Sequence, residues 1–210
     1  MPFAKQGQTA VVLAGGGYLF RLAATADDHR KIQRLLHQTF VLEVRQDADS
    51  GTGSLVDKFH HKNRYVVALR QEKLCGLIAL HDEPPFSTTE GLPGREAVER
   101  LCPRLLEARR LAVEPDERTG TVFAGLLWST YQYARRGGYQ FILMSGLLKR
   151  QTMYGRLGFR ALGAPVRKGQ ADFVPMLLDL LEIPERISLD LARWERKNGV
   201  SRAGVATSVK

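Results

Sequence analysis

Apolar and polar positions repeat along this 210-residue chain with two periods, which predict where strands and helices form. Short alternating or wholly apolar runs predict strands; they fall at 18–23, 65–69, 74–80, 106–113, 141–144, 159–162 and 173–178. Longer segments, most with apolar residues three and four positions apart, predict helices; they fall at 29–44, 94–102, 121–136, 150–157 and 188–197. The order of these elements predicts an α/β (α+β) fold in which helices flank a mixed sheet.

Local signals mark the ends of several elements. Asp27-Asp28 favours a helix start, because acidic residues are stabilising in the first turn of a helix. Gln71-Glu72-Lys73 predicts a hairpin between two strands, and Gly137-Gly138 predicts a helix end. Two helix faces are expected in the core: Ile32, Leu35, Leu36, Thr39 and Phe40 on the first long helix, and Phe123, Leu126, Leu127, Thr130, Tyr131 and Ala134 on the second.

The length and the element pattern predict one folded domain. Residues 1–17, which include three consecutive glycines, are expected to form a flexible lead-in. The domain is expected to span 18–180, followed by a helical extension over 181–200. The last segment, 201–210, is expected to be a disordered tail.

Composition narrows the class of protein. With 44% hydrophobic and 25% charged residues, the chain is typical of a soluble globular protein. No apolar run approaches the roughly 20 residues that span a bilayer, and no signal peptide is evident, so we expect no transmembrane segment and a cytoplasmic location. The 31 Lys and Arg against 22 Asp and Glu give a net charge of +9. This charge favours an acidic partner, while the absence of nucleic-acid-binding motifs argues against nucleic acid.

The stretch from Leu105 to Phe159 carries the candidate chemistry. A strand that contains Glu107 is followed by the turn Asp116-Glu117-Arg118-Thr119-Gly120 and then by a helix. A polar, glycine-containing turn before a helix start is a standard seat for phosphate. The stretch ends with Tyr154-Gly155-Arg156-Leu157-Gly158-Phe159. A carboxylate, an anion cradle and a phenol are the parts that acyl transfer needs.

This stretch resembles the GNAT superfamily of N-acyltransferases. Val113-Glu114-Pro115, Arg118-Thr119-Gly120 and the 154–159 segment carry the resemblance, which covers Tyr18 to Leu180. Glu107-Ala108-Arg109-Arg110-Leu111 resembles the Glu-x-Ser-Arg-Phe stretch of acyl-homoserine-lactone synthases and of the related N-acyl amino acid synthases, with Arg109 at the Ser and Leu111 at the Phe. The resemblance implies a mostly antiparallel sheet that is splayed in the middle, between strands 106–113 and 141–144.

The resemblance also implies catalytic roles. Glu107 is expected to be the base that handles the amine, with partial burial raising its pKa; the alternative is a salt bridge to Arg109 or Arg110. Tyr154 is expected to give its proton to the departing thiol, and the alternative is a packing aromatic. Donor-binding residues are expected on the strand and in the turn that follows: Leu111, Ala112, Val113, Arg118, Thr119, Gly120, Thr121 and Val122.

The donor loop departs from the usual Gln/Arg-x-x-Gly-x-Gly/Ala pattern, because Gly120 follows Arg118 by two residues. This departure favours the single phosphate of pantetheine, and therefore acyl carrier protein, over the diphosphate of coenzyme A; the alternative is a solvated turn. No tightly bound cofactor is expected, and the acyl donor is a co-substrate. Asp57-Lys58-Phe59 resembles the Asp-x-Phe-Asp element of lactone synthases, with His60 at the final Asp, and is expected to close the acceptor side.

Three functions remain open at this point. The first is transfer of a long-chain acyl group from acyl carrier protein to the amine of an amino acid or similar small metabolite. The second is an ordinary acetyltransferase that uses acetyl-coenzyme A, and the third is an inactive module that binds an acyl carrier. His60-His61 is expected to be a surface pair rather than a metal site. Arg135-Arg136 and Arg167-Lys168 are expected to be solvated, or to contact a carrier protein.

Overall fold

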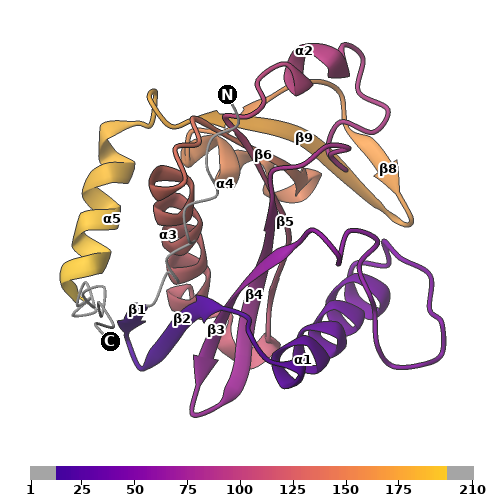
Figure 1. Ribbon diagram of the computed structural model, residues 1–210, viewed down its shortest axis with the longest axis vertical. Coiled ribbons are helices and arrows are strands. Elements are labelled where there is room, and N and C mark those ends of the chain that lie inside the picture. The colour runs from indigo at the N-terminus through magenta and orange to yellow at the C-terminus, as the bar shows by residue number, and fades with distance from the viewer. Residues whose placement is uncertain (1–12, 198–210) are drawn as a thin grey trace, which may run out of the picture.

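The computed structural model describes residues 13–197, which form a mixed nine-stranded sheet with helices on both faces (Figure 1). The sheet order is β1-β2-β3-β4-β5-β6-β9-β7, and β8 also pairs with β9. Only β5 and β6 run parallel to each other, and every other pair is antiparallel. The strands are β1 Leu13–Gly15, β2 Tyr18–Leu22, β3 Arg64–Arg70, β4 Lys73–His81, β5 Leu105–Val113, β6 Phe141–Leu147, β7 Arg160–Ala161, β8 Val166–Lys168 and β9 Ala171–Asp179.

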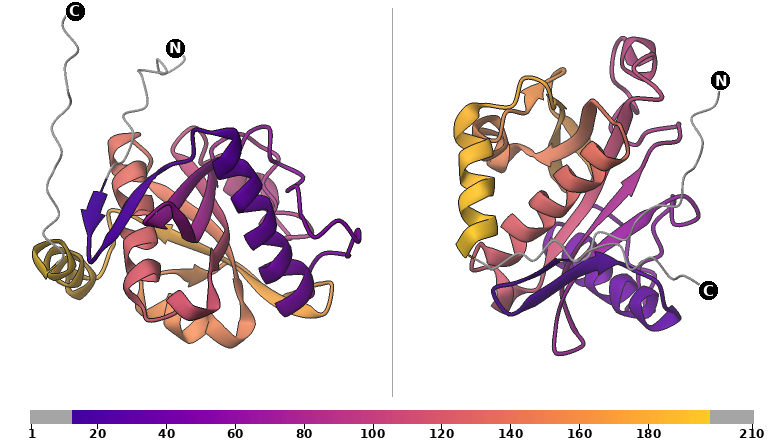
Figure 2. Two further views of the ribbon diagram at one scale, coloured as in Figure 1. Left: turned by 90° about the horizontal axis from the view of Figure 1, so that it is seen from below. Right: turned by 60° about the vertical axis from the view of Figure 1, so that its left-hand side comes forward.

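Helices cover the two faces of this sheet, with α1 on one face and α3 on the other (Figure 2). The helices are α1 Ala26–Leu36, α2 Arg95–Glu99, α3 Thr121–Arg136, α4 Gln151–Arg156 and α5 Glu185–Lys197. Helix α5 lies beside α3 at the edge of the molecule (Figure 1). The predicted helix over 121–136 has the same bounds as α3, and the predicted terminal helix starts three residues late, since α5 begins at Glu185.

Alternation along the strands divides the core into two layers, because successive strand residues point to opposite faces. On β3, Val66 and Ala68 pack in the layer under α3, whereas Tyr65, Val67 and Leu69 pack in the layer under α1. All five are buried. The continuous apolar character of β3 therefore follows from coverage of both faces of the sheet.

The first helix differs from its prediction at both ends. It starts three residues early at Ala26, because the Thr25 hydroxyl accepts a hydrogen bond from the Asp28 N–H and the Asp28 carboxylate accepts one back from the Thr25 N–H. This reciprocal pair is a capping box. After Leu36 the chain continues as a π-helix over His37–Glu43. The apolar period alone gave no sign of this change of winding. The short strands β1 and β8 were also not predicted.

The sheet is split between β5 and β6, as the resemblance implied. The two strands pair only from Leu105↔Phe141 to Glu107↔Leu143. Beyond that point they diverge, so the backbone of β5 that faces β6 has no partner among the described strands. The expected GNAT-like, mostly antiparallel sheet with a splayed middle is confirmed. The expected tail over 201–210 and most of the expected lead-in over 1–17 lie outside the described residues.

Candidate active site

A cavity of about 520 Å³ occupies the split in the sheet, a size within the roughly 300–1,000 Å³ of small-molecule sites. One end is apolar and lies among β6, α3, α4 and α5. Its lining includes Leu127, Tyr131, Ile142, Met144, Leu157, Ile183, Ile187 and Leu191. The other end carries charge. Its lining includes Asp47, Lys58, Ser87, Glu90, Arg109, Arg110 and Lys168.

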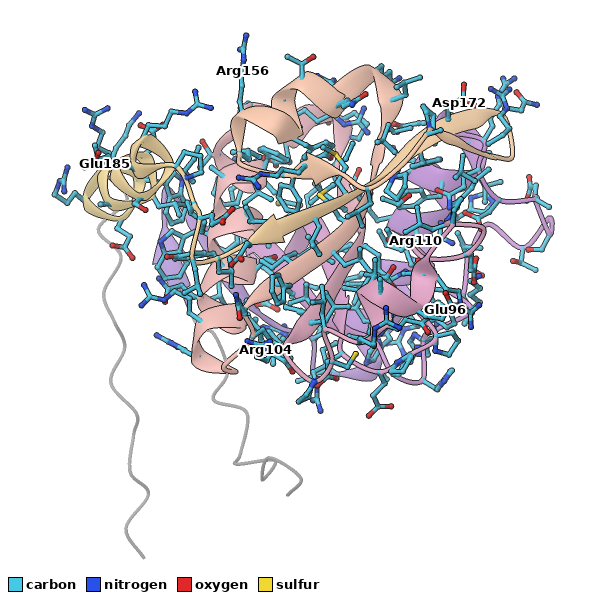
Figure 3. All side chains as sticks on the ribbon, turned by 90° about the horizontal axis from the view of Figure 1, so that it is seen from above. Glu96, Arg104, Arg110, Arg156, Asp172 and Glu185 are labelled. Carbon is cyan, nitrogen blue, oxygen red and sulfur yellow. The ribbon has the colours of Figure 1, made fainter. Side chains whose placement is uncertain are left out.

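A kink in β5 shapes the charged end. The register between β4 and β5 shifts by one residue near Ile78, and Arg110 takes a φ of 53°, a left-handed conformation that is uncommon for residues other than glycine. The Arg110 guanidinium donates to Asp47 and to Asp57, with Nε 2.7 Å from Asp57 Oδ2. The Arg110 side chain is buried, whereas Arg156 points outward from α4 (Figure 3). These ion pairs hold the kinked strand in place.

Asp57 is buried beside the kink in β5 and accepts hydrogen bonds from two arginines, because Arg109 donates to it as well as Arg110. Burial would raise the pKa of Asp57, but Arg109 and Arg110 outweigh it and hold the pKa below its ordinary value. The neighbouring Lys58 lines the cavity and pairs with Glu90, at 2.5 Å. The sequence motif that contains Asp57 and Lys58 thus lies at the charged end of the cavity; that it closes the acceptor side stays a prediction.

Glu107 is fully buried and does not line the cavity. Its carboxylate accepts hydrogen bonds from the Ser87 N–H at 3.1 Å, the Ser87 hydroxyl at 3.0 Å and the Thr88 N–H at 2.7 Å. His81 Nε2 lies 2.6 Å from Oε2, in a close contact that is not aligned as a hydrogen bond. The carboxylate therefore anchors the 86–89 loop against β5.

The raised pKa expected for Glu107 is wrong. Burial does act in that direction, but His81 and Arg109 outweigh it and lower the pKa of Glu107 to about 2. The alternative role, a salt bridge to an arginine, has only weak support. Arg109 Nε lies 4.0 Å from Glu107 Oε2, which is long for an ion pair. A catalytic role for Glu107 stays a prediction, and its surroundings are those of a structural anchor. Its partners Ser87 and Thr88 lie in a turn-rich connection between β4 and α2, for which the sequence predicted no site residue.

Tyr154 is brought into the cavity. It lies on α4, is 8% exposed, and packs edge-to-face on Phe159. A Cβ added at Gly146 would lie 2.9 Å from its ring, so glycine at 146 on β6 makes room for the tyrosine. Burial raises the pKa of the Tyr154 phenol, which keeps it protonated at neutral pH. Among the described residues no hydrogen-bond partner holds the hydroxyl, so the proton is available to a ligand.

The predicted donor residues are only partly brought together. Leu111 lines the cavity, whereas Ala112, Val113 and the 118–122 segment lie outside its lining. The Arg118 guanidinium is folded back, with Nη2 2.6 Å from Glu43 and Nε 3.0 Å from the Val113 carbonyl. Gly120 precedes α3 with a φ of 94° and leaves the helix start without a side-chain cap. An uncapped helix start attracts anions, so this part of the expected phosphate loop retains its chemistry.

Lys168 lines the cavity, whereas the sequence predicted that it is solvated or contacts a carrier protein. Strand β8 carries it back to the charged end of the cavity, where Nζ donates to the Ser87 carbonyl at 2.9 Å. Burial lowers the pKa of Lys168. The turn between β8 and β9 packs against Gln46, and the Gln170 N–H in this turn donates to the Arg45 carbonyl at 2.8 Å. This contact joins the turn between β8 and β9 to the chain just after the π-helix.

Other kinds of site are not indicated within residues 13–197. No cluster of three metal-ligating side chains occurs in this range. None of the helices described there has the length and apolar content to cross a membrane. Arg135 and Arg136 are exposed at the end of α3, as expected.

Three solved structures of acyltransferases share this fold. FeeM, an N-acyl amino acid synthase from uncultured soil microbes, has a TM-score of 0.60 at 18% identity, covering 79% of this chain and 92% of its own. The coenzyme A-dependent acyl-homoserine lactone synthase BjaI has a TM-score of 0.61 at 21% identity, covering 80% and 82%. An acyl-CoA N-acyltransferase from Pseudomonas aeruginosa has a TM-score of 0.54 at 16% identity, covering 77% and 98%.

These identities establish the fold alone, and no protein of curated function matches the chain in sequence. A sequence-family model is more specific. The model of the N-acyl amino acid synthase FeeM matches residues 31–179, which is most of the chain and includes β5, the split and β9. The chain belongs to the FeeM family of N-acyl amino acid synthases and is an N-acyltransferase.

Proposed function

We propose that the protein transfers a long-chain acyl group from a pantetheine thioester on acyl carrier protein to the amine of an amino acid or similar small metabolite. The observation that carries the proposal is the cavity with one apolar and one charged end. An acyl chain matches the apolar end, and a small zwitterion matches the charged end. The thioester carbon then lies between them, in the split of the sheet.

In this proposal the donor lies along the free edge of β5. Backbone groups beyond Glu107 that face β6 lack strand partners among the described residues, and an extended pantetheine arm satisfies such groups as an added strand does. The uncapped start of α3 and Arg118 supply positive potential for the donor phosphate. For Arg118 this requires that its guanidinium leaves Glu43.

The reaction forms one bond and breaks one bond. The neutral amine attacks the thioester carbon, the C–N bond forms, the C–S bond breaks, and the amine nitrogen loses a proton. The thiolate leaves and takes a proton from Tyr154, whose phenol lines the cavity without a competing partner among the described residues. Water accepts the proton that the amine nitrogen loses and passes it to the phenolate, so that the products are the amide and the free thiol. Tyr154 thus acts as the general acid.

The acceptor lies at the charged end. Lys168 is the cation there that has no carboxylate partner among the described residues, since Lys58 pairs with Glu90 and Arg109 with Asp57. We therefore assign the acceptor carboxylate to Lys168. Glu107 supports this end indirectly, because it fixes the loop whose Ser87 carbonyl holds Lys168. In this assignment Glu107 is a positioning residue rather than the base.

The experiment is an assay of the purified protein with a tetradecanoyl group on acyl carrier protein, the same group on coenzyme A, and acetyl-coenzyme A. Thiol release and mass spectrometry of the products are followed with a panel of amino acids and their amides. The proposal expects fastest transfer from the carrier protein, to acceptors that keep a free carboxylate. Substitution of Arg135 and Arg136, the exposed pair on α3, should slow only the carrier-protein reaction.

Preference for acetyl-coenzyme A would instead show an ordinary acetyltransferase, and binding of the acyl carrier without transfer would show an inactive module. The role of Glu107 is separated by a pH profile of kcat/KM. If Glu107 is the base, Glu107→Gln removes the acidic limb of the profile. If Glu107 is a positioning residue, the limb stays and the whole curve falls.

A further inference from the structure

Helix α5 forms a wall of the cavity at its apolar end. Ile183, just before the helix, and Ile187 and Leu191 within it line the cavity. Their spacing of four residues places them on one face of the helix. Leu189 lies on the outer face and is 52% exposed. The inner face therefore belongs to the cavity and the outer face to solvent.

The helix is packed onto the domain as a cover. None of its residues is fully buried. At its start the Arg186 guanidinium donates to the Arg156 carbonyl at 2.5 Å, and at its far end the Trp194 ring lies 6.1 Å from that of Trp128 and 6.0 Å from that of Phe20. The helix is thus held at both ends, and the cavity-lining residues lie between these attachments.

This wall lies outside the part of the chain that the family model matches. The match ends at residue 179, whereas α5 spans Glu185–Lys197. The split of the sheet, Tyr154 and the charged end all lie inside the matched segment. The end of the apolar space is therefore supplied by a segment that the match does not include.

We propose that α5 sets the length of the acyl chain that the protein accepts, with Leu191 and Ile187 as the specificity-determining residues. This inference rests on the proposed function, because it requires that the apolar end holds the acyl chain. A chain that reaches α5 gains from each methylene it buries there, and a longer chain meets the helix. One methylene in a hydrophobic pocket changes specificity roughly 10-fold or more.

The test compares three variants of the full chain: Leu191→Ala enlarges the end of the cavity, Leu191→Phe fills it, and Leu189→Phe makes the same chemical change on the exposed face. For each, kcat/KM is measured with saturated acyl donors of four to sixteen carbons. We expect Leu191→Phe to disfavour the longest accepted donor roughly 10-fold and to leave short donors unchanged. Leu191→Ala should extend the range, and Leu189→Phe should match the wild type.

A second measurement separates this inference from the proposed function. Trp128 and Trp194 are the only tryptophans of the chain and lie where α5 meets α3, so intrinsic fluorescence reports binding of free saturated fatty acids without turnover. The variants could change the preferred length of bound fatty acid as predicted while none of them transfers an acyl group. That result would support α5 as the wall of the cavity and overturn the proposed function. Acyl transfer with an unchanged length profile in Leu191→Phe and Leu191→Ala would overturn the α5 inference alone.

An equal rise in kcat/KM with donors of every length in Leu191→Ala would also overturn the α5 inference. In that case α5 would hinder entry of the donor and would not form the end of the cavity. Ile187→Phe fills the same space from one turn nearer the start of the helix. It replaces Leu191→Phe if that variant does not fold, as judged by its melting transition.

Discussion

Replacement of Glu107 by glutamine is expected to destabilise the protein by about 3 kcal/mol at pH 7. The magnitude follows from the pKa of Glu107, which falls from its ordinary value of 4.5 to about 2, because a tenfold change in an acid dissociation constant corresponds to about 1.4 kcal/mol. The hydrogen bonds give a similar figure. The carboxylate accepts three of them, from Ser87 and Thr88, and the loss of one bond to a charged group costs about 1.5–3 kcal/mol. An amide keeps the shape and one acceptor oxygen but turns an NH₂ toward a donor of the loop.

The pH dependence of this effect has a definite sign. The folded-state pKa lies below the unfolded one, so the stabilisation is complete above about pH 4.5 and is lost as the pH falls toward 2. The difference in unfolding free energy between wild type and Glu107→Gln should therefore shrink as the pH is lowered from 7 toward 3. Urea unfolding at a series of pH values measures it.

The matched control is Glu90→Gln, at the end of the same loop. The Glu90 side chain is 45% exposed and pairs with Lys58, and substitutions of exposed residues usually change stability by less than about 0.5 kcal/mol. For a domain of this size, 3 kcal/mol corresponds to a melting temperature about 6–12 °C lower. If Glu107→Gln melts within about 2 °C of the wild type, the buried carboxylate does not anchor the loop and the argument is refuted.

Three further predictions concern turnover. Tyr154→Phe should lower kcat by less than the roughly 100-fold typical of a lost general acid, with KM unchanged, because thiolate is a tolerable leaving group; no change in kcat would show that Tyr154 only packs. Lys168→Met should raise KM roughly 10- to 100-fold for acceptors with a free carboxylate, from the loss of a charged hydrogen bond, and leave KM for their amides unchanged; an equal effect on both would contradict the assignment. Arg118→Ala should raise KM for both donors a few-fold. Glu43→Gln frees the Arg118 guanidinium and should lower KM for both donors. Steady-state kinetics measure both changes, and a higher KM in Glu43→Gln would contradict the phosphate contact of Arg118.

The fold was largely predictable because its elements have strong periods. Helix α3 was predicted to the residue, since its apolar spacing ends at Gly137. The split between β5 and β6 was predicted from the family resemblance and not from periodicity. The apolar pattern of a strand shows which of its faces is buried, but not where it separates from a neighbouring strand. Strand β8 was missed because three residues, two of them basic, carry no period.

The candidate site was predictable only where one segment carried it. Tyr154 lines the cavity, and its transfer of a proton to the departing thiol stays a prediction. The surroundings of Glu107 were not predictable, because its partners lie 19 and 20 residues away in a loop without regular structure. Lys168 looked like a solvated residue beside Arg167, and only the antiparallel pairing of β8 with β9 turns it inward. Both misses concern contacts between segments distant in sequence.

The short pairing between β5 and β6 has a consequence for how the chain holds itself together. The sheet has two antiparallel halves, joined at this seam by three residue pairs. A ligand that fills the seam contacts both halves at once, so its binding stabilises their packing against each other. Ligand present at a hundred times its dissociation constant would add about 2.7 kcal/mol to the folded state. The acyl donor would then stabilise the fold of the protein as well as react in it.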